Sequence, residues 1–249
     1  MYRFFVSDDQ INIEDKKVII KGQDVNHIKN VLRMKKGEEI SVSNGNDDRE
    51  FRCAISDYTD EGVECELRFI KEGSGELPVK VFLFQGLPKA DKMETIIQKN
   101  VELGVFETVP VVMKRCVVKL DEKKASSKTA RWQEISKAAA MQSKRGIIPE
   151  VKHPMTYTEA LSYAKENCDV LLLPYEMGED MAQTKELFNS IKKGSNIAVF
   201  IGPEGGFDVS EIEKAKEAGF KTITLGKRIL RTETAGMYVM SVLGYLFEE

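Results

Sequence analysis

Two glycine-rich segments, each directly after an apolar run, constrain the fold of this chain more than any other feature of its sequence. The first reads IGPEGGF over residues 201–207, and the second reads LGKRILRTETA over residues 225–235. A glycine-rich turn of this kind typically leaves a strand and opens a helix. Because ligands of open α/β sheets bind at the carboxyl ends of the strands, two such turns close together predict a single small-molecule pocket.

The first segment does not have the composition of a polyphosphate-binding loop. It lacks a Gly-Lys-Ser/Thr ending, and its glycines are spaced G-x-x-G-G rather than G-x-G-x-x-G. Glu204 also adds a carboxylate where a pyrophosphate needs hydrogen-bond donors only. These features favour a ligand that has no phosphate and that carries positive charge.

The composition is that of an ordinary soluble protein, with 42% hydrophobic and 31% charged residues in 249. This length suffices for one large or two modest domains. There is no apolar run of about 18 residues, so we expect no membrane span, and the first residues, MYRFFVSDDQ, do not read as a secretory signal. The four cysteines have no C-x-x-C spacing. We therefore expect a cytoplasmic protein with reduced thiols, no disulfide framework and no metal.

The net charge of −3 is unevenly distributed along the chain. Residues 1–70 carry 11 Lys/Arg and 15 Asp/Glu, a net charge of −4, whereas residues 114–145 carry 10 Lys/Arg and 3 Asp/Glu, a net charge of +7. Because a phosphate backbone responds to local positive charge, the overall balance does not exclude nucleic acid as a partner.

The first 70 residues predict a small β-barrel, because apolar residues alternate or cluster there in strand-length runs separated by turn residues. One short helix is expected from Asp24, as its N-cap, to Leu32. His27 on this helix is interpreted as a structural residue. Residues 71–78, rich in glycine and polar residues, read as a linker. The predicted strands are 2–6, 17–20, 39–43, 50–56 and 62–70.

From residue 79 onward, strand and helix patterns alternate, which predicts a parallel α/β domain. Thr156 with Glu159, and Asp208 with Glu211, have the spacing of capping boxes at helix starts. The last helix, 234–247, is apolar on nearly every side, so it must be buried in the core or against a partner chain. The predicted strands are 79–85, 109–113, 170–173, 197–201 and 222–225, and the other helices are 89–103, 129–144, 156–166, 181–193 and 208–219.

IGPEGGF followed by LGKRILRTETA closely resembles the RsmE family of SPOUT-class RNA methyltransferases. The resemblance extends over nearly the whole chain, and the order and spacing of its motifs make it specific. The further motifs are Arg3-Phe4-Phe5, the His27–Arg33 run, GLPKADKME at 86–94 and RW-x-x-I-x-x-A-x-x-Q-S-x-R at 131–145.

This resemblance implies a Rossmann-like parallel-sheet SPOUT domain with a trefoil knot at residues 73–249, and a PUA-like β-barrel RNA-binding domain at residues 1–72. It implies a homodimer that uses S-adenosylmethionine to methylate N3 of one uridine in the decoding region of 16S rRNA, within the small ribosomal subunit. Two alternatives stay open: another SPOUT reaction, such as 2′-O-ribose methylation of tRNA or rRNA, and a non-catalytic RNA-binding protein of ribosome assembly.

In the SPOUT pattern, three loops hold the cofactor. Their glycines permit a close approach of the backbone, their N–H groups are donors for the adenine edge or the carboxylate, and their leucines enclose the purine. Transferred by motif, the expected cofactor residues are Leu173, Pro174, Glu176, Gly202, Pro203, Glu204, Gly205, Gly206, Leu225, Gly226, Ile229, Leu230, Thr234 and Ala235.

Methylation at N3 of uracil removes an imide proton and leaves negative charge on the flanking carbonyl oxygens. An arginine stabilises such charge, and its planar fork of donors suits a uracil edge. Arg231 is the first candidate for this catalytic role and Arg228 the second, with an ion pair to Glu233 or a ribosomal phosphate as the alternative. Glu204 and Glu233 are candidates for the general base by residue type only, so the base stays unassigned.

The expected RNA-binding groups come mainly from the helix start after residue 86 and from the basic segment 114–145. We expect Glu94 or Glu102 to orient the two lysines of that helix start, although a solvated helix face would explain the same charges. Lys114-Arg115-Cys116 departs from the usual Glu-Arg-Ser of the family, which removes a carboxylate and a hydroxyl there. The expected RNA-binding residues are Arg3, Arg33, Lys89, Lys92, Arg115, Lys119, Arg131, Gln142, Ser143 and Arg145.

Overall fold

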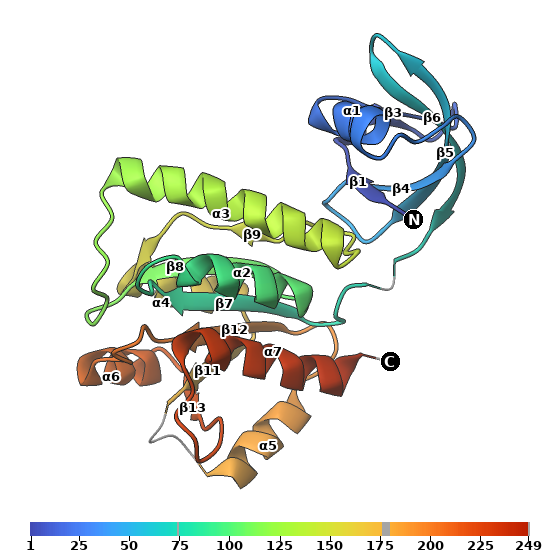
Figure 1. Ribbon diagram of the computed structural model, residues 1–249. Helices are drawn as coiled ribbons and strands as arrows, with labels where there is room; N and C mark the ends of the chain where they lie inside the picture. Colours follow the sequence, from blue (N-terminus) through green and yellow to red (C-terminus); the bar gives the residue numbers. More distant parts are fainter. Residues whose placement is uncertain (74, 176–179, 249) are drawn as a thin grey trace. The chain divides into compact units, whose positions relative to one another are not determined.

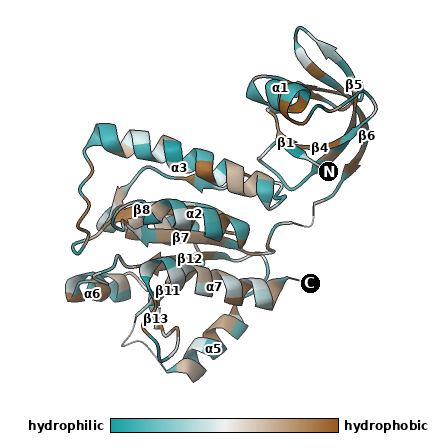
Figure 2. Cartoon of the chain, in the orientation of Figure 1, coloured by the Kyte–Doolittle hydropathy of each residue, from teal (hydrophilic) through white to brown (hydrophobic). Residues whose placement is uncertain are grey.

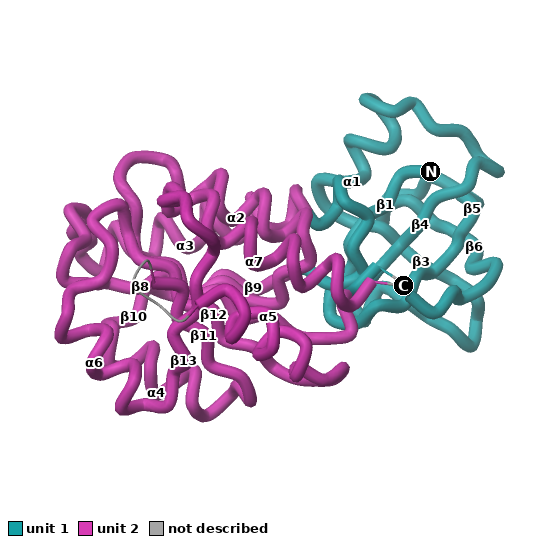
Figure 3. Tube along the Cα trace, turned by 90° about the horizontal axis from the view of Figure 1, so that it is seen from below, with its two compact units in different colours: residues 1–76, 140–148 teal, residues 77–139, 149–249 magenta. Residues whose placement is uncertain are grey.

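The computed structural model describes residues 1–73, 75–175 and 180–248. Its contacts divide the chain into two compact units, each coloured separately in Figure 3. The first unit comprises Met1–Glu76 and Ala140–Ile148, and the second comprises Leu77–Ala139 and Pro149–Glu249. The first unit therefore includes a short segment that lies far along the sequence from the rest of it.

The first unit is built on a six-stranded sheet with the order β1-β4-β5-β6-β3-β2 (Figure 1). β1 pairs with β4 in parallel, and the other pairs are antiparallel. One face of the sheet encloses a fully buried apolar core that includes Phe4, Ile40 and Phe51, and this confirms the barrel that the strand pattern predicts. The strands are β1 Arg3–Phe5, β2 Ile11–Asn12, β3 Lys17–Ile20, β4 Glu39–Ser43, β5 Glu50–Thr59 and β6 Gly62–Lys71.

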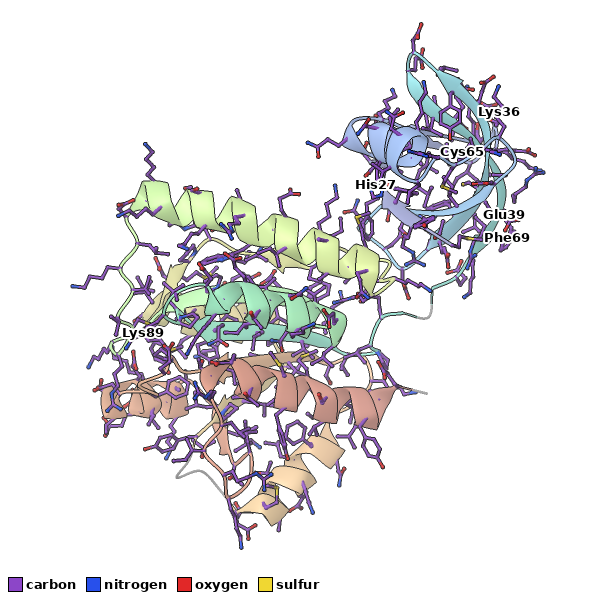
Figure 4. The ribbon with its side chains drawn as sticks, viewed as in Figure 1. His27, Lys36, Glu39, Cys65, Phe69 and Lys89 are labelled. Atoms are coloured by element: carbon purple, nitrogen blue, oxygen red, sulfur yellow. The ribbon has the colours of Figure 1, made fainter. Side chains whose placement is uncertain are left out.

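The short helix of the first unit differs from the expected one. It consists of α1, Gln23–Asn26, followed by one turn of π-helix, His27–Val31. The N-cap residue is Gly22, at φ 75°, so the expectation that Asp24 caps the helix is wrong. His27 lies beside the barrel (Figure 4). Its ring packs edge-on against the ring of Phe4, with 6.3 Å between the two centroids, in agreement with a structural role.

The second unit is a parallel α/β domain, as the alternating pattern predicts. Its sheet has the order β10-β8-β7-β12-β11-β13, with β9 paired to β8, and every pair is parallel. β12 pairs with β7 along its whole length, so the first glycine-rich segment leaves the middle of the sheet. The strands are β7 Lys80–Gly86, β8 Glu107–Val112, β9 Glu150–Val151, β10 Met155–Thr156, β11 Val170–Pro174, β12 Asn196–Ile201 and β13 Lys221–Ile223.

Helices cover both faces of this sheet (Figure 1). α4, Tyr157–Asn167, and α6, Val209–Glu217, enclose a core in which the Phe84 and Phe200 rings stack at 4.3 Å. α2, Lys92–Glu102, and α7, Thr232–Phe247, pack together on the other face. α5, Met181–Ser190, lies near β13. Both predicted capping boxes form at the starts of α4 and α6.

Three helices begin at residues other than the predicted ones. α2 begins at Lys92 rather than 89, because Ala90 at φ 54° is not helical. α3, Glu122–Gln142, begins seven residues before the predicted 129; its first turns are hydrophilic (Figure 2), so they show no apolar period, but the Asp121 carboxylate accepts the N–H of Lys124 at 2.8 Å. α7 begins at Thr232, with Arg231 as its N-cap.

α7 buries one face only. Val239, Met240 and Leu243 are buried against the domain, whereas Tyr238, Tyr245 and Leu246 are exposed, Tyr245 to 88%. The expected burial of this apolar helix in the core is therefore found for one of its faces, and the opposite face is exposed in the single chain. No helix in the described part of the chain combines the length and hydropathy that a membrane crossing needs.

Candidate active site

A cavity of about 940 Å³ lies at the carboxyl ends of β11, β12 and β13. Three segments line it: residues 174–175 after β11, residues 201–207 after β12, and most of residues 224–235 after β13. Lys92, Arg115 and Val209 complete the lining. The volume falls within the range of about 300–1,000 Å³ that is usual for small-molecule sites. The structure thus brings the two glycine-rich segments into one cavity, as the sequence predicts.

Most of the expected cofactor residues line this cavity. Leu173 does not, because it is fully buried in the core between the sheet and α4 and α6, so the expectation that it encloses a purine is wrong. Thr234 is exposed on the first turn of α7 and does not line the cavity either. Glu176 lies outside the described residues. The expected residues that line the cavity are Pro174, Gly202, Pro203, Glu204, Gly205, Gly206, Leu225, Gly226, Ile229, Leu230 and Ala235.

The first glycine-rich loop is packed directly on the end of β7. A Cβ atom at Gly86 would lie 2.7 Å from both Cδ and N of Pro203, so only glycine fits there. The loop turns through Gly206, at φ 66°, whose N–H donates to the Pro203 carbonyl at 2.8 Å. This packing fixes the backbone that faces the cavity.

A buried hydroxyl ties the two loops together. Thr232 Oγ1 donates to the Gly202 carbonyl at 2.6 Å and accepts from Gln85 Nε2 at 2.8 Å. Gln85 is fully buried on β7, and its amide also donates to the Gly86 carbonyl at 3.0 Å. Neither Gln85 nor Thr232 was among the predicted site residues. The one sequence feature that could have indicated a role for Gln85 was a polar residue at the end of an apolar strand.

Glu204 connects the first loop to the start of α2. Its carboxylate accepts from Lys92 Nζ at 2.9 Å and from the backbone N–H of Lys89 at 3.1 Å. Partial burial raises the pKa of the Glu204 carboxyl, but the hydrogen bonds from Lys92 and the backbone outweigh this effect and hold the pKa below its ordinary value. Lys89 itself lies on the loop before α2 (Figure 4).

The expected partners of these lysines are wrong. Glu94 pairs with Arg131 at 2.9 Å, and Glu102 pairs with Lys99 at 2.8 Å, so neither orients Lys89 or Lys92. Glu204 contacts both lysines instead, the side chain of Lys92 and the backbone N–H of Lys89, because the loop after β12 meets the N-terminal end of α2.

Both candidate catalytic arginines line the cavity. Arg228 lies within the second loop and Arg231 at the N-cap of α7, and both side chains are exposed. Within the described residues, neither guanidinium has an ion-pair or hydrogen-bond partner, and Glu233 pairs with Lys92 instead, at 3.6 Å. The two positive charges are therefore available to a molecule in the cavity.

The segment after β8 compensates for its departure from the family pattern. The Glu211 carboxylate accepts the N–H of Lys114 at 2.7 Å, and Cys116 Sγ accepts the N–H of Met113 at 3.3 Å. Arg115 Nη1 donates to the Gly205 carbonyl at 3.0 Å. A carboxylate from α6 and a thiol thus hold this turn, and Arg115 lies at the edge of the cavity.

Two expected RNA-binding residues are committed inside the first unit. Arg145 is buried, with 3% of its side chain exposed, in an ion pair with Glu76. Arg3 is nearly buried and pairs with Glu50 at 3.1 Å. Both guanidiniums are thereby neutralised and withdrawn from solvent, so the expectation that they meet phosphates is wrong.

The other expected RNA-binding residues remain at the surface. Lys92 and Arg115 line the cavity, and Arg131, which pairs with Glu94, keeps 65% of its side chain exposed. Lys89, Lys119 and, in the first unit, Arg33 and Gln142 are exposed, and Ser143 is half-buried.

No group of three or more metal-ligating side chains occurs among the residues that the structure describes.

The lining includes residues that the sequence analysis did not single out as binding groups. Most of them belong to the two quoted segments or adjoin an expected residue, so the only available signal was their position in the motif. They are Tyr175, Ile201, Phe207, Val209, Thr224, Lys227, Thr232 and Glu233.

Comparison with known proteins agrees with this geometry. A family model of an RNA methyltransferase domain matches residues 75–244, and a model of an RNA methyltransferase PUA domain matches residues 20–68. A ribosomal RNA small subunit methyltransferase E from Bacillus subtilis is 37% identical over 252 residues, which cover 100% of this chain and 98% of the relative. This chain belongs to the ribosomal RNA small subunit methyltransferase E family. A member from Mesomycoplasma hyopneumoniae is also 37% identical, over 97% of this chain and 98% of its own length.

Solved structures of the family share the whole fold. A ribosomal RNA small subunit methyltransferase E from Neisseria gonorrhoeae, bound to S-adenosylmethionine, superposes with a TM-score of 0.82 at 32% identity, covering 99% of this chain and 98% of that one. A methyltransferase from Legionella pneumophila, also with S-adenosylmethionine bound, gives 0.82 at 30% identity over 98% and 97% of the two chains. The second unit therefore has the SPOUT methyltransferase fold, and the first contains the PUA domain of the family.

Proposed function

We propose that this protein transfers the methyl group of S-adenosylmethionine to N3 of one uridine in the decoding region of 16S rRNA, in the small ribosomal subunit of the cytoplasm. The observation that carries the proposal is the cavity in which two glycine-rich loops meet two arginines that have no partner among the described residues. The relatives from Bacillus subtilis and Mesomycoplasma hyopneumoniae are named ribosomal RNA small subunit methyltransferase E. The choice of uridine N3 rests on the resemblance of the loop motifs.

The residues of the cavity fit S-adenosylmethionine. This cofactor has no phosphate and carries a positive sulfonium, which suits a cavity lined by Glu204 and Glu233 and lacking a phosphate-binding glycine pattern. Leu225 and Leu230 offer apolar contacts for a purine, and the turn at Gly206 displays backbone groups that can form hydrogen bonds. When bound, the cofactor supplies an electrophilic methyl group.

Arg231 is the proposed catalytic residue, and Arg228 supports it. Loss of the N3 proton places negative charge on the two uracil oxygens beside N3. A guanidinium in the cavity stabilises that charge by two donors in one plane. Arg231 suits this role because the N-cap position of α7 holds its backbone extended, at φ −66° and ψ 153°, while its side chain stays free.

The RNA is proposed to meet both domains. Residues 73–249 carry out methyl transfer and supply Lys89, Lys92, Arg115, Lys119 and Arg131 to the phosphate backbone. Residues 1–72 act as the PUA RNA-binding domain through Arg33, and Gln142 and Ser143 contact RNA from the end of α3.

A homodimer is proposed from the exposed face of α7. Tyr238, Tyr245 and Leu246 form an apolar surface on a helix whose other face is already buried, and apolar colours run along the helix in Figure 2. Exposed apolar surface of this kind typically marks a protein interface. Native mass spectrometry of the purified chain tests this assignment.

The decisive test is mass mapping of 16S rRNA from cells that lack this protein. The proposal requires that one uridine of the decoding region lose a methyl group on its base, and that the purified protein restore it. A missing 2′-O-methyl group would support the other SPOUT reaction. A fully methylated rRNA with defective small subunits would support the ribosome-assembly role.

A further inference from the structure

The proposed reaction needs a group that removes the N3 proton, and the cavity limits the choice. Among the described residues that line it there is no histidine, aspartate or cysteine, and the only carboxylates are Glu204 and Glu233. The nearby amine of Lys92 is an unsuitable base, because its hydrogen bond to Glu204 raises its pKa. Tyr175 and Lys227 also line the cavity, but tyrosine and lysine side chains are ordinarily protonated at neutral pH, so the base is sought among the two carboxylates.

Glu204 is occupied by other contacts. It accepts from Lys92 Nζ and from the backbone N–H of Lys89, and these bonds hold the first loop against the start of α2. They also stabilise the ionised form, which makes this carboxylate a weaker proton acceptor than a free one. Glu204 thus acts as a structural connection between two elements of the site.

Glu233 has the opposite character. Its Oε2 atom is closed off from solvent and has no hydrogen-bond partner among the described residues; Lys92 Nζ lies at 3.6 Å, within ion-pair range but too far for a hydrogen bond. A buried oxygen without a hydrogen bond is costly, so this carboxylate is less well satisfied than that of Glu204. Glu233 lines the cavity two residues after Arg231.

We propose that Glu233 is the general base that accepts the N3 proton of the target uridine. This inference rests on the proposed function. The N3–H bond breaks as an O–H bond forms on the Glu233 carboxylate, and the electron pair stays on N3, where it forms the new bond to the methyl carbon. S-adenosylmethionine supplies that methyl as a cation and leaves as a neutral thioether, and Glu233 then returns the proton to water.

Positive groups surround Glu233 in the cavity. Lys92 faces it from α2, and Arg228 and Arg231 face the same cavity from the second loop, with Arg115 at the edge. Glu204 is the only carboxylate beside it in the described lining, and Lys92 lies between the two. Positive groups therefore outnumber the two carboxylates in the described lining.

The test compares Glu233→Gln with the matched variant Glu204→Gln in the full-length protein. Affinity for S-adenosylhomocysteine is measured by calorimetry, and methylation is followed in a single turnover on small subunits from cells that lack the protein. Glu233→Gln should keep its affinity and lose about 10²–10⁴-fold in rate. Glu204→Gln should instead lose affinity, because the first loop loses its ion pair with Lys92 of α2. Glu233→Asp should keep part of the rate.

Two readouts separate a base from a structural residue. The rate of Glu233→Gln should rise about tenfold per pH unit, because without a base the reaction needs N3 already ionised, whereas the wild-type rate should depend less steeply on pH. In subunits reconstituted on a transcript with 5-fluorouridine, whose N3–H is more acidic, the deficit of Glu233→Gln should shrink.

The outcomes distinguish the base from the function. A wild-type product of 3-methyluridine, with an undiminished rate or the wild-type pH dependence in Glu233→Gln, overturns Glu233 as the base and leaves the function intact. A deficit that 5-fluorouridine does not reduce has the same meaning. A wild-type product methylated on ribose overturns the proposed function and the base together.

Discussion

Replacing Thr232 by valine tests how the site is held together. Valine has nearly the same shape as threonine, so the change removes the hydroxyl and little else. In the wild-type structure this hydroxyl donates to the Gly202 carbonyl and accepts from the Gln85 amide; Thr232 and Gln85 are buried, and Gly202 is half-buried. The variant therefore leaves a carbonyl and an amide without their partner.

The cost follows from those two contacts. A buried polar group left unsatisfied costs about 1–3 kcal/mol. The Gln85 amide retains its bond to the Gly86 carbonyl, at 3.0 Å, so its share lies at the low end of that range. We expect a total of about 2–4 kcal/mol, which corresponds to about 30- to 1,000-fold in an equilibrium constant.

This free energy should be divided between two measurable quantities. If the loop keeps its wild-type conformation, the whole cost appears in the free energy of unfolding, measured with urea. If the loop relaxes to solvate its groups, part of the cost appears instead as weaker binding of S-adenosylhomocysteine, measured by calorimetry. The sum of the two losses should reach about 2–4 kcal/mol in either case.

Thr232→Ser is the matched control, because it keeps the hydroxyl and loses one methyl group. It should lose only about 1 kcal/mol, from the smaller apolar surface that it buries. If Thr232→Val loses no more than this serine variant in the two measurements together, the hydroxyl does not hold the loops and the reasoning is refuted.

Three further predictions follow from named contacts. Gly205→Val should abolish calorimetric binding of S-adenosylhomocysteine with an unchanged far-UV circular dichroism spectrum, because a Cβ there already lies 3.1 Å from Arg115 Cβ; unchanged affinity would remove this loop from the site. Arg231→Ala should lose about two to three orders of magnitude in single-turnover rate at constant affinity; a loss of affinity alone would make it a binding residue. Arg145→Ala should lower the free energy of unfolding by about 1.5–3 kcal/mol, because it removes the charged hydrogen bonds of a buried guanidinium to the partly buried Glu76, while the exposed Arg131→Ala should cost less than about 1 kcal/mol; equal losses in urea would contradict this ranking.

The parts of the fold that depend on local sequence were predictable. A capping box joins residues three apart, so Thr156 with Glu159 identified the start of α4 without tertiary information. Alternation and apolar runs located the strands for the same reason, since burial of one or both faces leaves a local period. The start of α3 was missed because its first seven residues bury almost nothing except Ala125, so no period marks them.

Charge was a less reliable guide, because its effect depends on partners far away in the sequence. The count of +7 over residues 114–145 includes Arg145, which is neutralised by a carboxylate 69 residues earlier. Both partners of this ion pair, Arg145 and Glu76, lie in the first unit, which includes residues 140–148. A sequence window contains no information about such a partner.

The candidate site shows the same division between motif and assembly. The motif located the loops, because glycines and the apolar runs beside them can be recognised from the sequence alone. Two polar connections hold the site in place. Thr232 joins the second loop to Gly202 of the first loop and to Gln85 of β7, and Glu204 joins the first loop to Lys92 of α2. The contacts with Gln85 and with Lys92 each join residues more than 100 positions apart, so no local pattern predicts them. Because Glu204 already accepts hydrogen bonds from Lys92 and from the backbone of Lys89, Glu233 is the carboxylate of the described lining whose buried oxygen still lacks a hydrogen-bond donor.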